Sequence, residues 1–217
     1  DPSELEHKTR IPVVALAYGN LGDGRQTFYH TLTLLGQILN KTERAEQLIS
    51  FFNREIHALA SRTQAIDPMK TCFIGGVALK GPHGFQSTEP SYPPFAFVRA
   101  AHIAQTGSWT GTRLQHSLFS KEKMLQADPD VLFLDLSTLQ MGEHRNGMTE
   151  LHTDPVYQAL TAVKTQKVYG VLPYNWYSQN FGSILANSWY IGKTLYPEQF
   201  SDIDPAAKAD DIYAFLL

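Results

Sequence analysis

A stripe of hydrophobic positions with helical spacing runs from Thr42 to Thr63. Glu43 and Glu46 fall in its first turn, where the helix dipole favours negative charge, and Thr42 is the expected N-cap. The polar faces are expected to carry Arg44, Gln47, Asn53, Arg54, Glu55 and Arg62. At ~1.5 Å per residue, this single helix would be roughly 30 Å long, which is enough to span a domain.

Downstream of this helix, apolar runs alternate with helical patterns. The runs that predict strands are Thr71–Val77, Asp130–Leu136 and Lys167–Leu172. Asp130–Leu136 is the clearest buried strand among them. The segments that predict helices are Phe95–Thr106, Lys121–Ala127, Asp154–Val163, Asn180–Leu195 and Asp204–Leu217, whereas Trp109–Phe119 is ambiguous. Such alternation predicts an α/β fold, a three-layer αβα lobe with a mostly parallel central sheet, preceded by the long helix.

The first forty residues fit this scheme less well. Ile11–Ala17 is a β-branched run that predicts a strand, and Gln26–Leu39 predicts a helix. A lone parallel strand needs neighbours, so this strand is expected to pair with another chain or to cover the edge of the following sheet.

Composition narrows the function classes. The 217 residues are 43% hydrophobic and 18% charged, as in a folded soluble protein. A net charge of -3 without a Lys/Arg run argues against nucleic acid as a partner. The sequence has no apolar run near the ~20 residues of a membrane span. Its one cysteine, Cys72, lies in an apolar run and is expected to be a buried, inert thiol.

Ligands of open parallel sheets bind outside the carboxyl ends of the strands. Three predicted loops lie there: Leu79–Tyr92, Ser137–His144 and Tyr174–Asn180. They are rich in aromatic, amide and hydroxyl groups, which suit a bulky and partly polar ligand. The side chains expected to form this wall are Lys80, His83, Gln86, Ser87, Tyr92, Tyr174, Asn175, Trp176, Tyr177 and Asn180.

Motifs of catalysis and metal binding do not occur in these loops. The eight histidines show no HExxH or HxH spacing, and the chain has no GxSxG elbow. Gly75-Gly76 and Gly81-x-x-Gly84 lack the Lys-Ser/Thr of a P-loop, and Asp128-Pro129-Asp130 is a turn at the wrong end of a strand. The sequence therefore predicts a protein that is not an enzyme and that needs no cofactor or resident metal.

Five segments in order resemble the helix-linked substrate-binding proteins of ABC importers for iron-siderophore complexes, haem and cobalamin. These segments are TRIPVVALAYG, LLGQILNKTERAEQLISFFNREI, CFIGGVALKGPHGFQSTEPSYPPFAFVRAAHIAQ, SKEKMLQADPDVLFLD and AVKTQKVYGVLPYNWY. The resemblance implies that residues 1–41 are the remnant of a first lobe, 42–66 the helix between lobes, and 67–217 a second α/β lobe. A complete first lobe would hold roughly a hundred residues, so the chain is expected to carry only half of the cleft.

The resemblance also implies capture without chemistry, because a rigid linking helix allows only small lobe movements around a largely pre-formed cleft. The expected function is an extracytoplasmic, periplasmic or cell-surface component that delivers an iron chelate to a membrane permease, with the membrane met only through the permease or an absent N-terminal anchor. Glu122 is the expected permease contact.

Other functions remain open at this stage. Cobalamin, haem or another metal compound could be the ligand. A metal-dependent enzyme or chelatase would need His83 or His144 at a metal, with two histidines within about 5 Å of each other. A purely structural module is favoured only if the turn Tyr174–Tyr177 is buried.

Overall fold

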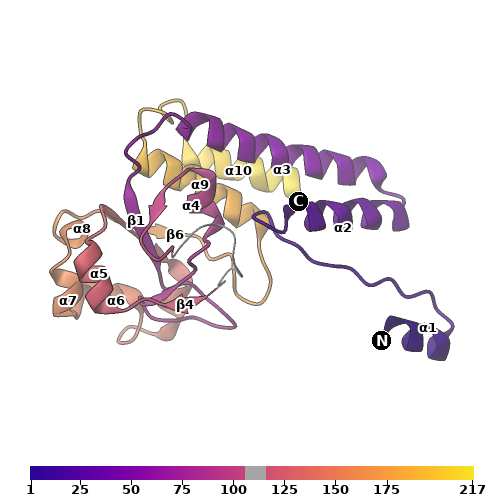
Figure 1. The fold of residues 1–217 in the computed structure, drawn as a ribbon, viewed down its shortest axis with the longest axis horizontal. Coiled ribbons are helices and arrows are strands. Elements are labelled where there is room, and N and C mark those ends of the chain that lie inside the picture. Colours follow the sequence, from indigo (N-terminus) through magenta and orange to yellow (C-terminus); the bar gives the residue numbers. More distant parts are fainter. Residues whose placement is uncertain (106–115) are drawn as a thin grey trace. The chain divides into compact units, whose positions relative to one another are not determined.

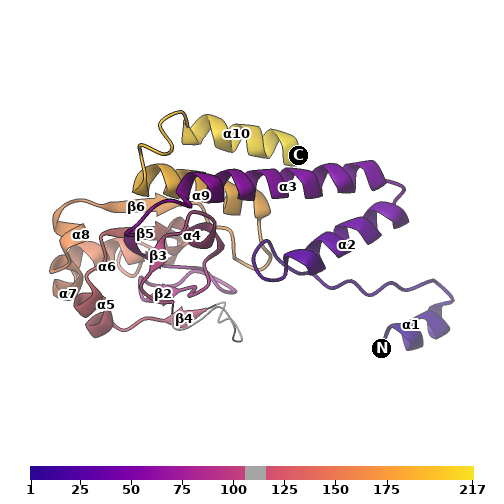
Figure 2. The same cartoon turned by 45° about the horizontal axis from the view of Figure 1, so that its top comes forward.

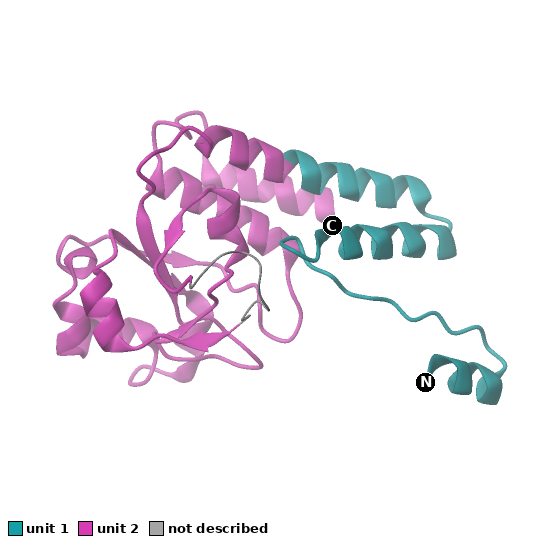
Figure 3. Ribbon diagram, viewed as in Figure 1, with its two compact units in different colours: residues 1–54 teal, residues 55–217 magenta. Residues whose placement is uncertain are grey.

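The computed structural model describes residues 1–105 and 116–217, which divide into two compact units, Asp1–Arg54 and Glu55–Leu217 (Figure 3). The boundary between the units falls inside one continuous helix, α3 (Thr42–Thr63). This helix has the bounds that its hydrophobic stripe predicts. The division of the chain at residues 41 and 66 stays a prediction.

The first unit consists of helices joined by short turns and one extended segment. It contains α1 (Pro2–Thr9), α2 (Arg25–Ile38) and the N-terminal part of α3. Phe28 of α2 and Phe52 of α3 pack with ring centroids 5.7 Å apart, and the Tyr29 hydroxyl donates to Asn53 Oδ1 at 3.0 Å. The α2–α3 pair is thus held by an apolar contact and a side-chain hydrogen bond.

The predicted strand Ile11–Ala17 is wrong. The segment is extended but joins no sheet of the described residues, and all its apolar side chains except the half-buried Val13 are exposed, with Ile11 64% accessible. A β-branched pattern favours extended backbone, but a strand also needs a partner edge for its N–H and C=O groups. Pro12 removes one of those donors.

The second unit alternates strands and helices after Thr63. Its strands are β1 (Thr71–Gly75), β2 (Ser87–Thr88), β3 (Ala101–His102), β4 (Ser117–Leu118), β5 (Val131–Asp135) and β6 (Val168–Val171). Its helices are α4 (Pro93–Phe97), α5 (Lys121–Ala127), the 3-10 helix η1 (Leu136–Met141), α6 (Gly147–Thr153), α7 (Pro155–Gln158), α8 (Thr161–Lys164), α9 (Phe181–Leu195) and α10 (Pro205–Leu216). The α/β class is therefore confirmed. None of the described helices has the length and apolarity of a membrane span.

Four strands form a parallel sheet in the order β3-β1-β5-β6 (Figures 1 and 2). Cys72 pairs with His102 on one side and with Val131 on the other, and Leu132 pairs with Val168. β2 and β4 make a separate antiparallel ribbon in which Ser87 faces Leu118. Since all four strands of the main sheet run in one direction, their carboxyl ends meet at one edge.

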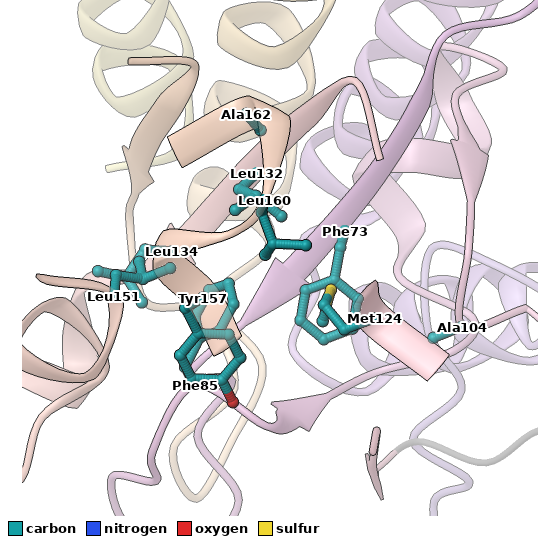
Figure 4. Packing of buried hydrophobic residues seen from close by; sticks show 10 residues of the cluster. All are labelled: Phe73, Phe85, Ala104, Met124, Leu132, Leu134, Leu151, Tyr157, Leu160 and Ala162. Atoms are coloured by element: carbon teal, nitrogen blue, oxygen red, sulfur yellow. The ribbon is translucent and has the colours of Figure 1, made fainter. Parts of the chain in front are cut away.

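Alternate side chains of the central strands enter two different packing layers. Phe73 and Leu132 belong to a buried cluster with side chains from α5 to α8 (Figure 4). On the opposite face Phe133 of β5 packs against Phe95 of α4, with ring centroids 5.5 Å apart, and α4 in turn contacts α9. Helices therefore cover both faces of the sheet, and the predicted three-layer arrangement is present.

Two predicted helices differ from the structure. Phe95–Thr106 is a short helix, α4, followed by strand β3, because Arg99 adopts a positive φ of 52° and Ala101 pairs with Thr71. Residue 106 lies outside the described part. The segment Asp154–Val163 is two helices, α7 and α8, broken at Leu160, whose backbone is extended. The spacing of hydrophobic residues along the sequence cannot reveal the end of the helix near Arg99 or the break at Leu160.

Glu55 is predicted on a polar face of α3 but is buried, with 4% of its surface accessible. Its carboxylate accepts from Trp189 Nε1 at 2.9 Å and pairs with Lys208 Nζ at 2.8 Å. Arg62, two turns later, forms hydrogen bonds to both carboxylate oxygens of Asp202 at 2.6 and 2.7 Å. Polar contacts between residues more than a hundred positions apart thus fix this part of α3 to α9, to α10 and to the connection between these two helices.

Candidate functional site

The loops that follow β1 and β6 are joined at the carboxyl edge of the sheet. The backbone N–H of Lys80 donates to the carbonyl of Trp176 at 2.9 Å. The 3-10 helix after β5 lies at the same edge, because the Ser137 hydroxyl donates to the Gly76 carbonyl at 3.4 Å. Two of the three predicted ligand loops are thus linked directly and the third is adjacent, as a parallel sheet requires.

The β1 loop folds back over the end of its own strand. A Cβ on Gly75 would lie 2.4 Å from the carbonyl oxygen of Phe85, so only glycine allows this approach. The Val77 N–H donates to the Ser87 carbonyl at 3.1 Å, and the Phe85 N–H donates to Glu150 Oε2 at 3.0 Å. Hydrogen bonds from backbone N–H groups of the loop therefore hold its conformation.

The predicted wall residues differ in exposure. Lys80, Tyr177 and Asn180 are exposed, and Tyr177 has 79% of its surface accessible. His83, Gln86, Asn175 and Trp176 are half-buried, whereas Ser87, Tyr92 and Tyr174 are buried. The turn Tyr174–Tyr177 is therefore buried at its first residue and open at its last. Its open part lies at the surface together with Lys80 and the half-buried Trp176.

A network of polar side chains lies beneath these loops. The Tyr174 hydroxyl donates to the Glu89 carboxyl, and the Tyr92 and Tyr174 rings are 5.6 Å apart. Asn187 of α9 donates to the Leu172 carbonyl at 2.8 Å and accepts from the Leu172 N–H at 2.9 Å. The network ties the β6 loop to the β2–α4 connection, so it supports the loops from below.

Burial controls the ionisation of this network. Desolvation, followed by the charge of Asp135, raises the pKa of Glu89 to about 7, although the hydrogen bond from Tyr174 opposes the shift. Burial also raises the pKa of Asp135 and lowers the pKa of His102 to about 4. His102 lies in β3, and its neutral ring packs against the ring of Phe95, with the two ring centroids 5.1 Å apart.

Two residues of this region were not predicted. Glu89 is the only acidic residue of the loop Ala78–Pro94, a composition signal that could have identified it. His116 lies directly before β4, and its ring centroid is 5.1 Å from that of His83. The sequence gives no signal for this pair, because thirty-three positions separate the two histidines and the pairing of β2 with β4 brings them together. The other histidine considered for metal chemistry, His144, is exposed.

The sequence pattern of the family described as periplasmic binding protein matches residues 1–174. The chain belongs to the periplasmic binding protein family. No curated protein matches it at a significant level. Family members are binding proteins that work outside the cytoplasm, which agrees with the predicted extracytoplasmic class.

Solved structures of periplasmic binding proteins share the fold. A periplasmic solute binding protein from Veillonella parvula DSM 2008 superposes with a TM-score of 0.68 at 19% identity, over 97% of this chain and 60% of that one. The molybdate-binding MolA of Haemophilus influenzae gives 0.67 at 16% identity, over 97% of this chain and 67% of that one. The haem-binding HutB of Vibrio cholerae gives 0.59 at 18% identity, over 91% and 74%. The chain thus spans about three fifths to three quarters of the length of these structures.

Asn180 has a structural role in this periplasmic binding protein. It is the N-cap of α9, and its side-chain oxygen accepts from the Ser183 N–H at 3.1 Å. Replacing Asn180 with alanine is expected to lower the free energy of unfolding by about 1 kcal/mol, whereas serine should retain most of the stability. Urea unfolding of the three proteins measures this difference, and equal midpoints for all three would contradict the capping role.

The expected permease contact of this periplasmic binding protein, Glu122, is fully exposed in the first turn of α5. Hydrogen bonds from its own backbone N–H and then from Ser120 hold the pKa of its carboxyl below the usual range. Glu122 is therefore charged on the surface at neutral pH, as a partner with basic side chains requires. The contact itself stays a prediction.

Proposed function

We propose that this chain is the ligand-binding part of a solute-binding protein that captures an iron chelate and delivers it to the permease of an ABC importer. The observation that carries the proposal is the Lys80–Trp176 backbone bond, which joins the loops after β1 and β6 into one pre-formed wall at the carboxyl edge of the sheet. Family membership supports a binding role, and catalysis is not part of the proposal.

The chemistry of the wall supports a large organic ligand. Trp176 and Tyr177 have ring centroids 6.5 Å apart and present a partly open aromatic surface. Nearby, Gln179 Oε1 is buried and has no hydrogen-bond partner among the described residues, so it could accept a ligand N–H or O–H. Aromatic faces with amide groups fit the organic shell of an iron chelate better than a bare oxyanion. Haem and cobalamin are the alternatives, and a haem-binding relative favours the first of these.

We propose that residues 67–217 are the second lobe, 42–66 the helix between lobes and 1–41 the end of the first lobe. The wall would then supply one side of the ligand site. Glu122, on α5, would meet the permease.

Tryptophan fluorescence tests the proposal. The chain and the complete product of its gene are titrated with ferric siderophores, haem and cobalamin. Trp176 is half-buried at the wall, whereas Trp189 is buried on α9, so ligand binding should quench the first and spare the second. Quenching by ferric siderophores at micromolar concentration or below is expected.

Variants decide which surface binds. Trp176→Phe should remove most of the quenching, and Tyr177→Ala should weaken binding by about tenfold through the loss of an aromatic contact. Leu118→Ala, at an exposed position of β4, is the matched control and should bind as the wild type does. If none of the ligands changes the tryptophan fluorescence of either protein, the chelate proposal is rejected.

A further inference from the structure

His83 and His116 form a pair whose ring orientation is set by the fold. His83 precedes β2 and His116 precedes β4, and the two strands pair in register. The ribbon is extended by a second pair of contacts: the Phe119 N–H donates to the Gln86 carbonyl at 2.9 Å, and Gln86 Nε2 donates to the Phe119 carbonyl at 3.2 Å. The rings lie 5.1 Å apart at an angle of 46°.

Hydrogen bonds select one tautomer of each ring. His83 Nε2 lies 3.0 Å from the Leu79 carbonyl, which can only accept, so this nitrogen carries the proton. Ser87 Oγ lies 2.6 Å from the Val77 carbonyl and gives its own proton there. His116 Nε2, 2.8 Å from the same oxygen, must therefore be the donor of the second bond.

Since Nε2 is the donor in each ring, Nδ1 is the nitrogen whose lone pair is available to a metal. Neutral imidazole is a common ligand of transition metals, and a metal-ligating histidine usually donates its other N–H to a carbonyl, carboxylate or hydroxyl. Leu79 and Ser87 occupy that supporting position here.

The spacing of the rings also fits a shared metal. At metal–nitrogen distances of about 2.1 Å, two imidazoles on neighbouring positions of one metal have ring centroids roughly 5 Å apart. Within the described residues, no three His, Cys, Asp or Glu side chains come together to hold a metal ion. The remaining coordination positions must therefore be filled by the bound molecule or by water.

We propose that His83 and His116 are a two-histidine site that binds, through both Nδ1 atoms, a transition-metal centre with two neighbouring coordination positions open. The site deepens the proposed function, on which it rests for its cargo: the chelate would be one that leaves its metal incompletely coordinated. Such a metal centre could arrive as a hydrated ion or inside an organic chelate, and the experiment separates these two sources.

The test uses the untagged chain and three probes. Nickel nitrilotriacetate leaves two neighbouring positions open, nickel EDTA leaves the metal fully enclosed, and hydrated cobalt is the bare ion. Calorimetry should show binding of the nitrilotriacetate complex and none of the EDTA complex. Binding of hydrated cobalt at least tenfold weaker than that of the nitrilotriacetate complex would assign the site to chelates, and the reverse order would assign it to the free ion.

Substitutions locate the site. His83→Ala and His116→Ala should each weaken binding of the nitrilotriacetate complex by more than tenfold, and Ser87→Ala by about tenfold or more through loss of the supporting acceptor. His144→Ala and His152→Ala, at exposed positions, are the matched controls and should leave it unchanged. Equal binding by the His83 and His116 variants, or equal binding of the EDTA complex, would overturn the proposal.

A second measurement is independent of any variant. The nickel complex is paramagnetic, so in the wild-type protein it should broaden the imidazole NMR signals of His83 and His116 and leave those of His144 and His152 sharp. Broadening of the exposed rings alone would also overturn the proposal. Failure of the nickel experiments would reject the two-histidine site and leave the result of the siderophore titration unaffected. Conversely, no response to any siderophore, together with intact nickel binding, would reject only the chelate function.

Discussion

Replacing Phe85 with alanine is expected to lower the free energy of unfolding by about 4 kcal/mol. Phe85 is fully buried, and its ring meets Phe73 and Tyr157 edge to face, with centroids 5.5 and 5.0 Å away. The change removes a large apolar side chain and two aromatic contacts. It also leaves a cavity in the cluster of Figure 4, which the rigid β1 strand cannot close.

Equilibrium urea unfolding measures the effect of Phe85→Ala. Phe85→Leu retains much of the volume and should lose roughly half as much stability. Tyr177→Ala is the control, because its ring is exposed, and should change stability by less than about 0.5 kcal/mol. A loss below about 1 kcal/mol for Phe85→Ala would contradict the packing of this cluster.

The second large effect is a dependence of stability on pH that originates at Glu89. Its pKa is about 7 in the folded chain against 4.5 in the unfolded chain. Between these values the folded state holds a proton that the unfolded state has lost, so stability falls as the pH rises. From about pH 4.5 to pH 8, the contribution of this carboxyl should change by about 3 kcal/mol against folding.

Glu89→Gln isolates that contribution. The glutamine carbonyl can still accept from the Tyr174 hydroxyl but has no charge to desolvate, so the variant should become more stable than the wild type above pH 7. Below pH 4.5 the two proteins should be nearly equal. Glu143→Gln, at an exposed position, is the control. Parallel stability curves for wild type and Glu89→Gln from pH 4.5 to pH 8 would contradict the raised pKa.

The parts of the fold that the sequence predicts are those with a strong local period. The stripe of α3 and the apolar runs of β1 and β5 each extend over several residues, so burial leaves a readable pattern. The run of β6 is also readable, although only Val171 of that strand is buried. The strand β3 has two residues and follows a short helix, so no period can mark it. Ile11–Ala17 has the pattern of a strand, but pattern alone does not supply a partner edge.

The site divides in the same way. The edge of the sheet that carries the loops follows from the order of the elements, and Lys80 and Trp176 do meet there. The order of the elements does not predict how deeply each side chain is buried. Tyr92 and Tyr174 lie in the buried network instead of on the open surface. Glu55 is misplaced for a similar reason, because its partners Trp189 and Lys208 lie far along the chain.

The bond between Lys80 and Trp176 uses only main-chain atoms. The side chains of Lys80 and Trp176 take no part in this bond, so they can be exchanged without breaking it, provided that the donor, Lys80, is not replaced by proline. Under the proposed function, related chains could thus acquire new cargoes by point substitution while the spacing of the loops stays constant. The main chain sets the spacing of the two loops, and the side chains set which ligand is bound. Directed evolution of binding can therefore begin with side-chain substitutions alone.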